Sequence, residues 1–287
     1  MNKSHRQTGD DAEPDGALKA EFDSIAFARA ARQAALRMTH HAKASHIGSC
    51  FSAADVMAVL YGRFLRINPK DPAWPERDRF ILSKGHAAAI LYASLALRGF
   101  FPMDWLDRYC DNGQPLAGHV MASGVPGVEV STGSLGHGLS IGLGMALGVC
   151  RDRQAGRVVV MLSDGECDEG SVWEAMLFAG HRSVSNLIAI VDYNKIQSLG
   201  NVQTVLDLAP FAEKWRACRW HVQEIDGHDH SAIERALIAT AESAAPSVIL
   251  AHTIKGRGVS FMENRLLWHY RSVNDQELAA ALKETDR

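Results

Sequence analysis

The sequence predicts an α/β fold in which helices cover both faces of a parallel sheet. Four short apolar runs rich in β-branched residues occupy the second half of the chain, at 158–163, 187–192, 221–225 and 247–252. Helical patterns at 170–181, 208–217 and 230–243 separate these runs. Continuous apolar strands that alternate with helices are typical of parallel sheets buried on both faces. Ligands of such sheets bind just beyond the carboxyl ends of the strands, so function is expected there.

The first half of the chain is predicted to be mainly helical. An Ala-rich segment without Gly or Pro predicts a long helix over 22–43, with Asp23 or Ser24 as its N-cap. Further helices are expected over 53–65 and 86–97, separated by a Pro-rich loop at 68–75 and a short apolar run at 79–82. The Gly-rich segment 110–138 predicts a long ordered loop, and loops of this length usually serve a function.

Composition and charge exclude several classes of protein. The chain has 287 residues, of which 47% are hydrophobic and 22% charged, so it is neither disordered nor collagen-like. Thirty basic and 33 acidic residues without a long basic run leave no electrostatic footprint for nucleic acid. The longest uncharged run, 130–150, contains glycines and hydroxyls throughout. It is expected to be a loop followed by a packed helix and not a membrane span.

The termini and cysteines bear on domain organisation and location. The first seventeen residues are polar and lack the apolar stretch of a secretory signal. They are predicted to be a disordered tail, and residues 18–287 are predicted to form a single domain. The five cysteines are scattered and form no C-x-x-C pair, so they are expected to be reduced in a cytoplasmic protein. Cys167 stands beside acidic residues, which disfavours a thiolate nucleophile.

Oxygen-bearing side chains follow two of the predicted strands. Asp164 and Gly165 come directly after the strand at 158–163, and Asn194 follows the strand at 187–192. Carboxylate, carboxamide and main-chain oxygens suit a hard divalent cation such as Mg²⁺, which leaves other positions to water and phosphate. These residues predict a metal-bridged diphosphate site. The plain alternative is that Asp164 and Asn194 are turn residues that cap the next helices.

Three histidines stand out among the thirteen in the chain. His46, His86 and His119 lie beside Gly or Ser in segments without periodicity, where groups that transfer protons near neutral pH are expected. His40 and His41, by contrast, fall at a predicted helix end, where the helix dipole favours them. Zinc is not expected, because neither the group His40, His41, His46 and Cys50 nor the pair His228 and His230 has the spacing of a known zinc motif.

The stretch from Ser163 to Lys195 resembles the thiamine-diphosphate motif, which begins with GDG and ends in Asn about thirty residues later. The segments SHIGSCFSAAD, LSKGHAA, GHV, STGSLGHGLS and TIKGRGVSFME accompany it, in the order typical of transketolases. From about residue 20 to 270 the chain is therefore similar to the transketolase family. The resemblance implies the fold of a thiamine-diphosphate-binding, diphosphate-type domain.

The resemblance implies a role for each residue that matches a family position. Mg²⁺, or another divalent cation such as Ca²⁺ or Mn²⁺, would be bound by Asp164, Asn194 and the main-chain oxygen of Ile196. Thiamine diphosphate would be contacted by His86, Gly133, Ser134, Leu135, Gly165, Asn194 and His269. The residues expected to face the reactive carbon and the substrate are His46, His119 and His269.

Some positions depart from the family pattern. Ser163 replaces the first Gly of GDG, which is expected to be tolerated because Asp164 carries the ligand oxygen. His137 stands where Gln is common, and it is expected either to pack against its loop or to alter donor recognition. Glu169 and Glu174 are either carboxylates favoured by the start of a helix or, as the resemblance implies, residues at a subunit contact.

The resemblance also implies a function and a partner. A complete transketolase is similar to this chain followed by an aminopyrimidine-binding domain and a third domain. The chain ends at Arg287, so we expect the N-terminal subunit of a split transketolase, active with a separate C-terminal subunit in an α2β2 heterotetramer. The pair would transfer a two-carbon ketol unit from a ketose phosphate to an aldose acceptor. Two alternatives stay open: an α-type subunit of a 2-oxo acid dehydrogenase and a non-catalytic regulatory homologue.

Overall fold

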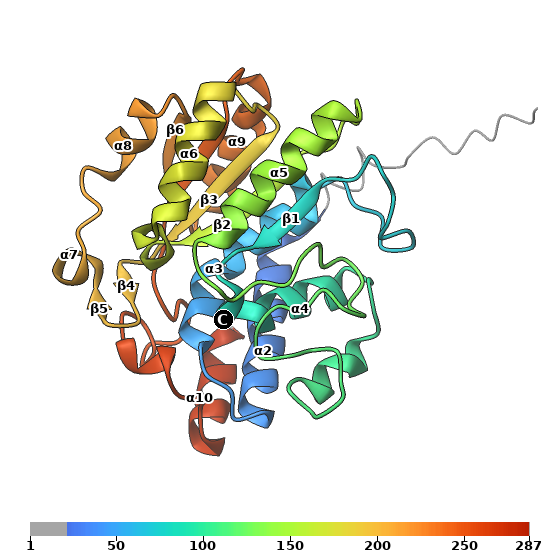
Figure 1. Ribbon diagram of the computed structural model, residues 1–287. Coiled ribbons are helices and arrows are strands. Elements are labelled where there is room, and N and C mark those ends of the chain that lie inside the picture. The colour runs from blue at the N-terminus through green and yellow to red at the C-terminus, as the bar shows by residue number, and fades with distance from the viewer. Residues whose placement is uncertain (1–21, 287) are drawn as a thin grey trace, which may run out of the picture.

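The computed structural model describes residues 22–286, so the tail predicted over 1–17 lies outside the described residues. Its centre is a parallel five-stranded sheet in the order β1-β2-β3-β7-β6 (Figure 1). The strands are β1 (Arg79–Leu82), β2 (Val158–Ser163), β3 (Leu187–Tyr193), β6 (His221–Asp226) and β7 (Ser247–His252). The predicted α/β class is confirmed, and the apolar run at 79–82 joins the sheet as an edge strand beside β2.

Helices cover both faces of this sheet. On one face lie α2 (Ser24–His41), α3 (Ile47–Val59), α4 (Ala88–Leu97) and α9 (His230–Ala239). The other face, nearer the viewer in Figure 1, carries α5 (His137–Arg151), α6 (Gly170–Arg182) and α8 (Phe211–Ala217). α3 continues as a π-helical turn (Leu60–Phe64), and α10 (Asp275–Thr285) packs against α2. The smaller elements are β4 (Ile196–Gln197), β5 (Gly200–Asn201), α7 (Val202–Val205) and 3-10 turns at Gly85–Ala87, Met103–Arg108, Gly165–Asp168, Thr240–Glu242 and Leu266–His269.

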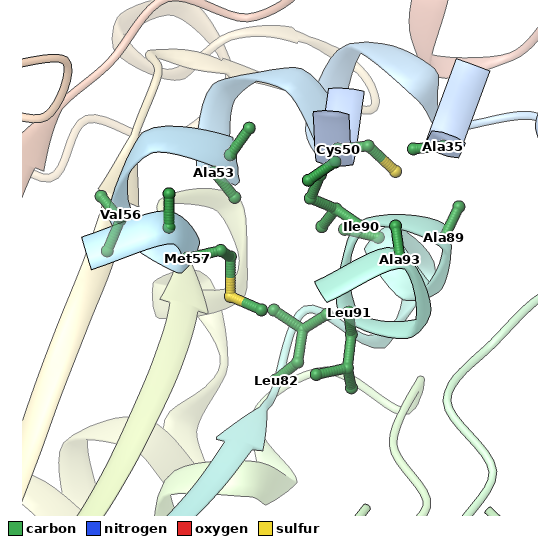
Figure 2. Packing of buried hydrophobic residues seen from close by; sticks show 14 of the residues in the cluster. Ala35, Cys50, Ala53, Val56, Met57, Leu82, Ala89, Ile90, Leu91 and Ala93 are labelled. Atoms are coloured by element: carbon green, nitrogen blue, oxygen red, sulfur yellow. The ribbon is translucent and has the colours of Figure 1, made fainter. Parts of the chain in front are cut away.

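Alternate residues of the central strands fill two separate cores. Val159 of β2 belongs to the core that contains residues of α2, α3, α4 and α9, whereas its neighbour Val160 belongs to the core that contains residues of α5, α6 and α8. All six residues of β2 are buried. Figure 2 shows the first core, where Met57 of α3 points toward Leu82 at the end of β1 and Leu91 of α4. This two-sided burial is why the strands read as continuous apolar runs and do not alternate with polar residues.

Most of the predicted elements are present, with boundaries within a few residues of those expected. Asp23 caps α2 as predicted, because its side chain accepts a hydrogen bond from the Ala26 N–H at 2.9 Å. The helix predicted over 53–65 begins earlier, at Ile47, since every residue of α3 is buried and packing outweighs the weak helix propensity of Gly48 and its polar neighbours. Neither α10 nor the β4–β5 hairpin was predicted.

The long loop before α5 is ordered by local hydrogen bonds and close contacts. α5 begins at His137, which confirms the expected loop and packed helix within 130–150.

Within residues 22–286 there is no helix both long enough and apolar enough to cross a membrane.

Candidate active site

The carboxyl ends of four parallel strands surround a cavity of about 220 Å³. β2 leads into Asp164, β3 into Asn194 and β7 into Lys255, while the helices that begin at this edge bring histidines from the first half of the chain. The lining residues are His46, Ser49, His86, His119, Gly133, Leu135, Ser163, Asp164, Gly165, Asn194, Ile196, Gln197, Ser198, Lys255 and His269. The cavity therefore brings together every predicted site residue except Ser134, which is exposed and lies outside the lining.

The loop that carries His119 is fixed from two sides. The Tyr92 hydroxyl donates to the His119 carbonyl at 3.1 Å and accepts the N–H of Met121 at 3.0 Å. The Thr132 hydroxyl donates to the carbonyl of Leu82, at the end of β1, at 2.6 Å. A Cβ atom at the next residue, Gly133, would lie only 2.9 Å from His119 Cδ2, so glycine lets this loop close against the imidazole.

His46 occupies a left-handed backbone conformation at the start of α3, with φ of 74°. Such a conformation is uncommon for residues other than glycine and is frequent at functional sites. The backbone N–H of His46 donates to the carbonyl of His269 at 3.2 Å. This bond joins the beginning of α3 to the turn that follows β7, so the imidazoles of both residues enter the same cavity.

Four imidazoles form a cluster on the cavity wall. The His46 ring centroid lies 4.9 Å from that of His269, 5.2 Å from His86 and 5.8 Å from His119. Burial, together with His119 and Lys255, lowers the pKa of His46 to about 4, and burial and Lys255 lower the pKa of His269 to about 3. Burial also lowers the pKa of His86. These three rings are uncharged at neutral pH, and each presents one donor and one acceptor nitrogen.

The metal ligands suggested by the resemblance meet at the ends of β2 and β3. Asp164 accepts the N–H of Gly165 at 2.8 Å, and the Asn194 amide oxygen accepts the N–H of Ile196 at 3.1 Å. Burial and the neighbouring Asp192 raise the pKa of Asp164 to about 6. A buried carboxylate beside a second carboxylate favours a bound cation, and the carboxylate, amide and carbonyl oxygens here are the donors that Mg²⁺ prefers. The residues fit the implied metal.

Two buried lysines were not identified from the sequence. Lys84 and Lys255 are almost fully buried, with 0% and 1% of their surface exposed. Lys84 forms a buried ion pair with Asp192 and donates to the Ser49 carbonyl at 3.0 Å. Burial raises the pKa of Asp192, but Lys84 together with hydrogen bonds from the Ser52 and Thr253 hydroxyls holds that pKa below its usual range. In the KGHA and TIKGRG segments both lysines stand beside glycine soon after an apolar run, but no local pattern shows that their side chains are buried.

Lys255 brings positive charge into the cavity itself. Its Nζ donates to the Ile196 carbonyl at 2.9 Å and lies 3.2 Å from His269 Nδ1. Burial and the nearby Lys84 lower the pKa of Lys255 to about 8. An ammonium group with few protein acceptors around it is suited to the oxygens of a diphosphate.

Glu166 is a second residue that sequence reasoning missed. Its buried carboxylate accepts hydrogen bonds from the Ser83 hydroxyl, from the N–H of Gly136 at 2.9 Å and from the N–H of Ser163 at 3.2 Å. It thereby ties the ends of β1 and β2 to the Gly133–Gly136 loop. His137, at the start of α5, is exposed and its Nδ1 lies 3.2 Å from the Leu135 carbonyl, so it contacts its own loop and does not line the cavity.

Comparison with known proteins identifies the family. Residues 24–285 match the family model described as transketolase, thiamine diphosphate binding domain. The chain is 44% identical over 246 residues to the 6-deoxy-6-sulfo-D-fructose transketolase subunit SqwG of Clostridium sp. (strain MSTE9), covering 84% of this chain and 88% of the relative. It is 39% identical over 239 residues to one subunit of the apulose-4-phosphate transketolase of Actinobacillus succinogenes, covering 83% and 87% of the two chains.

Solved structures agree with this assignment. The transketolase of Campylobacter jejuni superposes with a TM-score of 0.87 at 28% identity, over 92% of this chain and 42% of that chain. The chain thus spans about two fifths of the length of that transketolase. The fold, the cavity at the carboxyl edge of the sheet and the sequence matches together show that the chain belongs to the transketolase family, as a thiamine-diphosphate-binding domain.

Proposed function

We propose that this chain is the N-terminal subunit of a two-chain transketolase, which transfers a two-carbon ketol unit from a ketose phosphate to an aldose acceptor. The observation that carries the proposal is the cavity in which Asp164, Asn194 and the Ile196 carbonyl meet four clustered histidines. Family membership favours this reaction over that of a 2-oxo acid dehydrogenase, and the retained polar lining argues against a non-catalytic homologue.

Each group has a proposed part in holding the cofactor. Asp164, Asn194 and the Ile196 main-chain oxygen would bind Mg²⁺ or another divalent cation. The diphosphate would be contacted by Gly165, Asn194, His86, His269 and Lys255, and the Gly133-Ser134-Leu135 segment would lie along the cofactor. Thiamine diphosphate supplies a stabilised carbanion when bound, and the protein contributes binding, orientation and proton transfer.

Three of the clustered histidines would provide the proton chemistry. His46, His119 and His269 line one cavity, where an imidazole donates to a developing alkoxide or accepts a proton from a sugar hydroxyl. The low pKa values of His46 and His269 keep their acceptor nitrogens free of protons at neutral pH. We assign these three residues to substrate contact and proton transfer.

A partner chain is part of the proposal. Relatives that this chain matches over most of their length are named as transketolase subunits. We infer a separate C-terminal subunit with an aminopyrimidine-binding domain, assembled as an α2β2 heterotetramer. Sugar phosphates are the proposed substrates. The five cysteines are all unpaired, which supports a cytoplasmic location.

The test is to purify the chain from its native cell extract, identify the chain that co-purifies, and assay ketol transfer. We expect activity that needs both chains, thiamine diphosphate and Mg²⁺. Asp164→Ala should abolish Mg²⁺-dependent cofactor binding, whereas Asp152→Ala, at an exposed carboxylate after α5, should leave it unchanged. Cofactor binding retained by Asp164→Ala would refute the site assignment, and activity with a 2-oxo acid alone would refute the reaction.

A further inference from the structure

Behind the cavity, a buried carboxylate gathers polar side chains from three elements. Asp55 of α3 accepts two hydrogen bonds from the Arg32 guanidinium of α2, at 2.9 and 2.5 Å. Its oxygens also lie 2.7 Å from His228 Nδ1, in the segment between β6 and α9, and 3.1 Å from His230 Nε2, at the first residue of α9. None of these four residues lines the cavity.

The hydrogen-bond partners of His228 fix which nitrogen carries its proton. The main-chain N–H of Ile254 donates to His228 Nε2 at 2.8 Å. An N–H group can only donate, so Nε2 must present its lone pair. The ring proton is therefore on Nδ1, where it is donated to Asp55. His228 is a neutral bridge between the Asp55 carboxylate and the backbone that follows β7.

That backbone leads directly to the cavity. Ile254 precedes Lys255, whose Nζ reaches the Ile196 carbonyl and His269. On the other side, the Thr253 hydroxyl donates to Asp192. Backbone bonds also hold the segment 253–255, from the Thr253 N–H to the Tyr193 carbonyl at 3.3 Å and from the Asn264 N–H to the Lys255 carbonyl at 2.9 Å. The imidazole of His228 is the acceptor for the Ile254 N–H between them.

We propose that His228, oriented by Asp55, is a positioning residue that holds the backbone at Ile254 and so aims Lys255 at the diphosphate of the cofactor. The inference rests on the proposed function, because it assigns to Lys255 a role toward that diphosphate. His228 has 8% of its side chain exposed, which shields its bond to Ile254 from competition by bulk water.

The test compares two replacements of His228 in the assembled enzyme, with thiamine diphosphate and Mg²⁺ as the probe. His228→Asn keeps a short amide near Asp55 but cannot reach Ile254, whereas His228→Gln extends an amide oxygen that can accept the Ile254 N–H. We expect the cofactor Kd to rise about tenfold in the Asn variant and to stay within about twofold of wild type in the Gln variant. Hydrogen exchange at the Ile254 amide should accelerate only in the Asn variant.

A matched control and a double variant show whether the effect passes through Lys255. His252→Asn alters a neighbouring histidine whose side chain pairs with Glu224 and forms no hydrogen bond with residues 253–255. The cofactor Kd of this variant should therefore equal that of wild type. If His228 acts through Lys255, His228→Asn should weaken binding little further in a Lys255→Met background. Additive losses in that background would overturn the proposal.

Two other results would also overturn it. Cofactor binding by His228→Asn that equals wild type, even with a lowered melting temperature, would show a merely structural role. Equal losses in the Asn and Gln variants would show that the bond to Ile254 is not what matters. If the wild-type assembly binds no thiamine diphosphate, the proposed function fails and the inference fails with it, whereas binding by wild type with unaffected variants refutes the inference alone.

Discussion

The imidazoles of His46 and His269 couple folding to pH. Their pKa values of about 4 and about 3 lie below the ordinary histidine value of about 6.5. Between those limits the unfolded chain binds more protons than the folded one, so stability should fall as the pH falls from about 6.5 to 3. Above about pH 7.5 and below about pH 2 these two residues should no longer make the free energy of unfolding depend on pH.

Equilibrium denaturation of the cofactor-free chain at a series of pH values measures this effect. Near pH 5 the two residues should add about two protons to the uptake on unfolding. His46→Asn should remove about one of them, and asparagine suits the left-handed backbone at this position better than most residues do. A proton uptake that His46→Asn leaves unchanged would show that this imidazole is not held neutral by the fold.

Site residues differ in how far sequence reasoning could find them. Asp164 and Asn194 were predictable because each follows an apolar run, and parallel strands end at one edge of a sheet. His46 could be singled out because it lies beside Ser45 in a segment without periodicity, but its role toward the substrate required the family resemblance. Glu166 was missed because its importance comes from three hydrogen-bond partners that the fold brings together from distant segments.

Helix α5 offers a test of how closely elements pack. A Cβ atom at Gly142 would lie 2.4 Å from Val160 Cγ2, so this glycine lets α5 approach β2. Gly144, on the same helix, has open space around it. Gly142→Ala should destabilise the chain by about 1–3 kcal/mol through overpacking. Gly144→Ala should stabilise it by about 0.5–1 kcal/mol through helix propensity.

Urea denaturation of the two variants separates packing from propensity, because both make the same chemical change in one helix. Equal shifts of the denaturation midpoint in the two variants would contradict the close approach of α5 to the sheet. Such an approach is hard to predict from sequence, since Gly142, Gly144 and Gly148 look alike there. The strands were predicted more accurately because burial on both faces makes each one a continuous apolar run.

Elements with few apolar residues were the ones that sequence reasoning missed. The β4–β5 hairpin pairs only Ile196 with Asn201 and Gln197 with Gly200, so it carries no periodic pattern. It still supplies Gln197 and the Ile196 carbonyl to the cavity wall. α10 begins with a capping box at Asn274 and Glu277, so the sequence did contain a local signal for the start of this helix.

For the whole molecule, the proposed site predicts how ligands change stability. A ligand that binds only the folded state at 100 times its Kd stabilises that state by about 2.7 kcal/mol. At about 2.1 cal/mol/K of unfolding entropy per residue, each kcal/mol raises the melting temperature of a chain of this size by about 1.5–2 °C. Thiamine diphosphate with Mg²⁺ should therefore raise the temperature at which this chain unfolds in the assembled enzyme by about 4–5 °C, and a chelator should reverse the shift. Differential scanning calorimetry measures both.

The same measurement distinguishes a site contained in one chain from a site shared between two. In the proposed site, the residues at one sheet edge would supply ligands for a metal and a diphosphate, and the proposed partner would bind the aminopyrimidine. At equal ligand concentrations, the shift should then be larger for the assembly than for this chain alone, because the partner adds contacts that only the complex can make. It should also depend on protein concentration. Equal shifts with and without the partner would mean that this chain binds the cofactor unaided, and the proposal of a shared site would have to be abandoned.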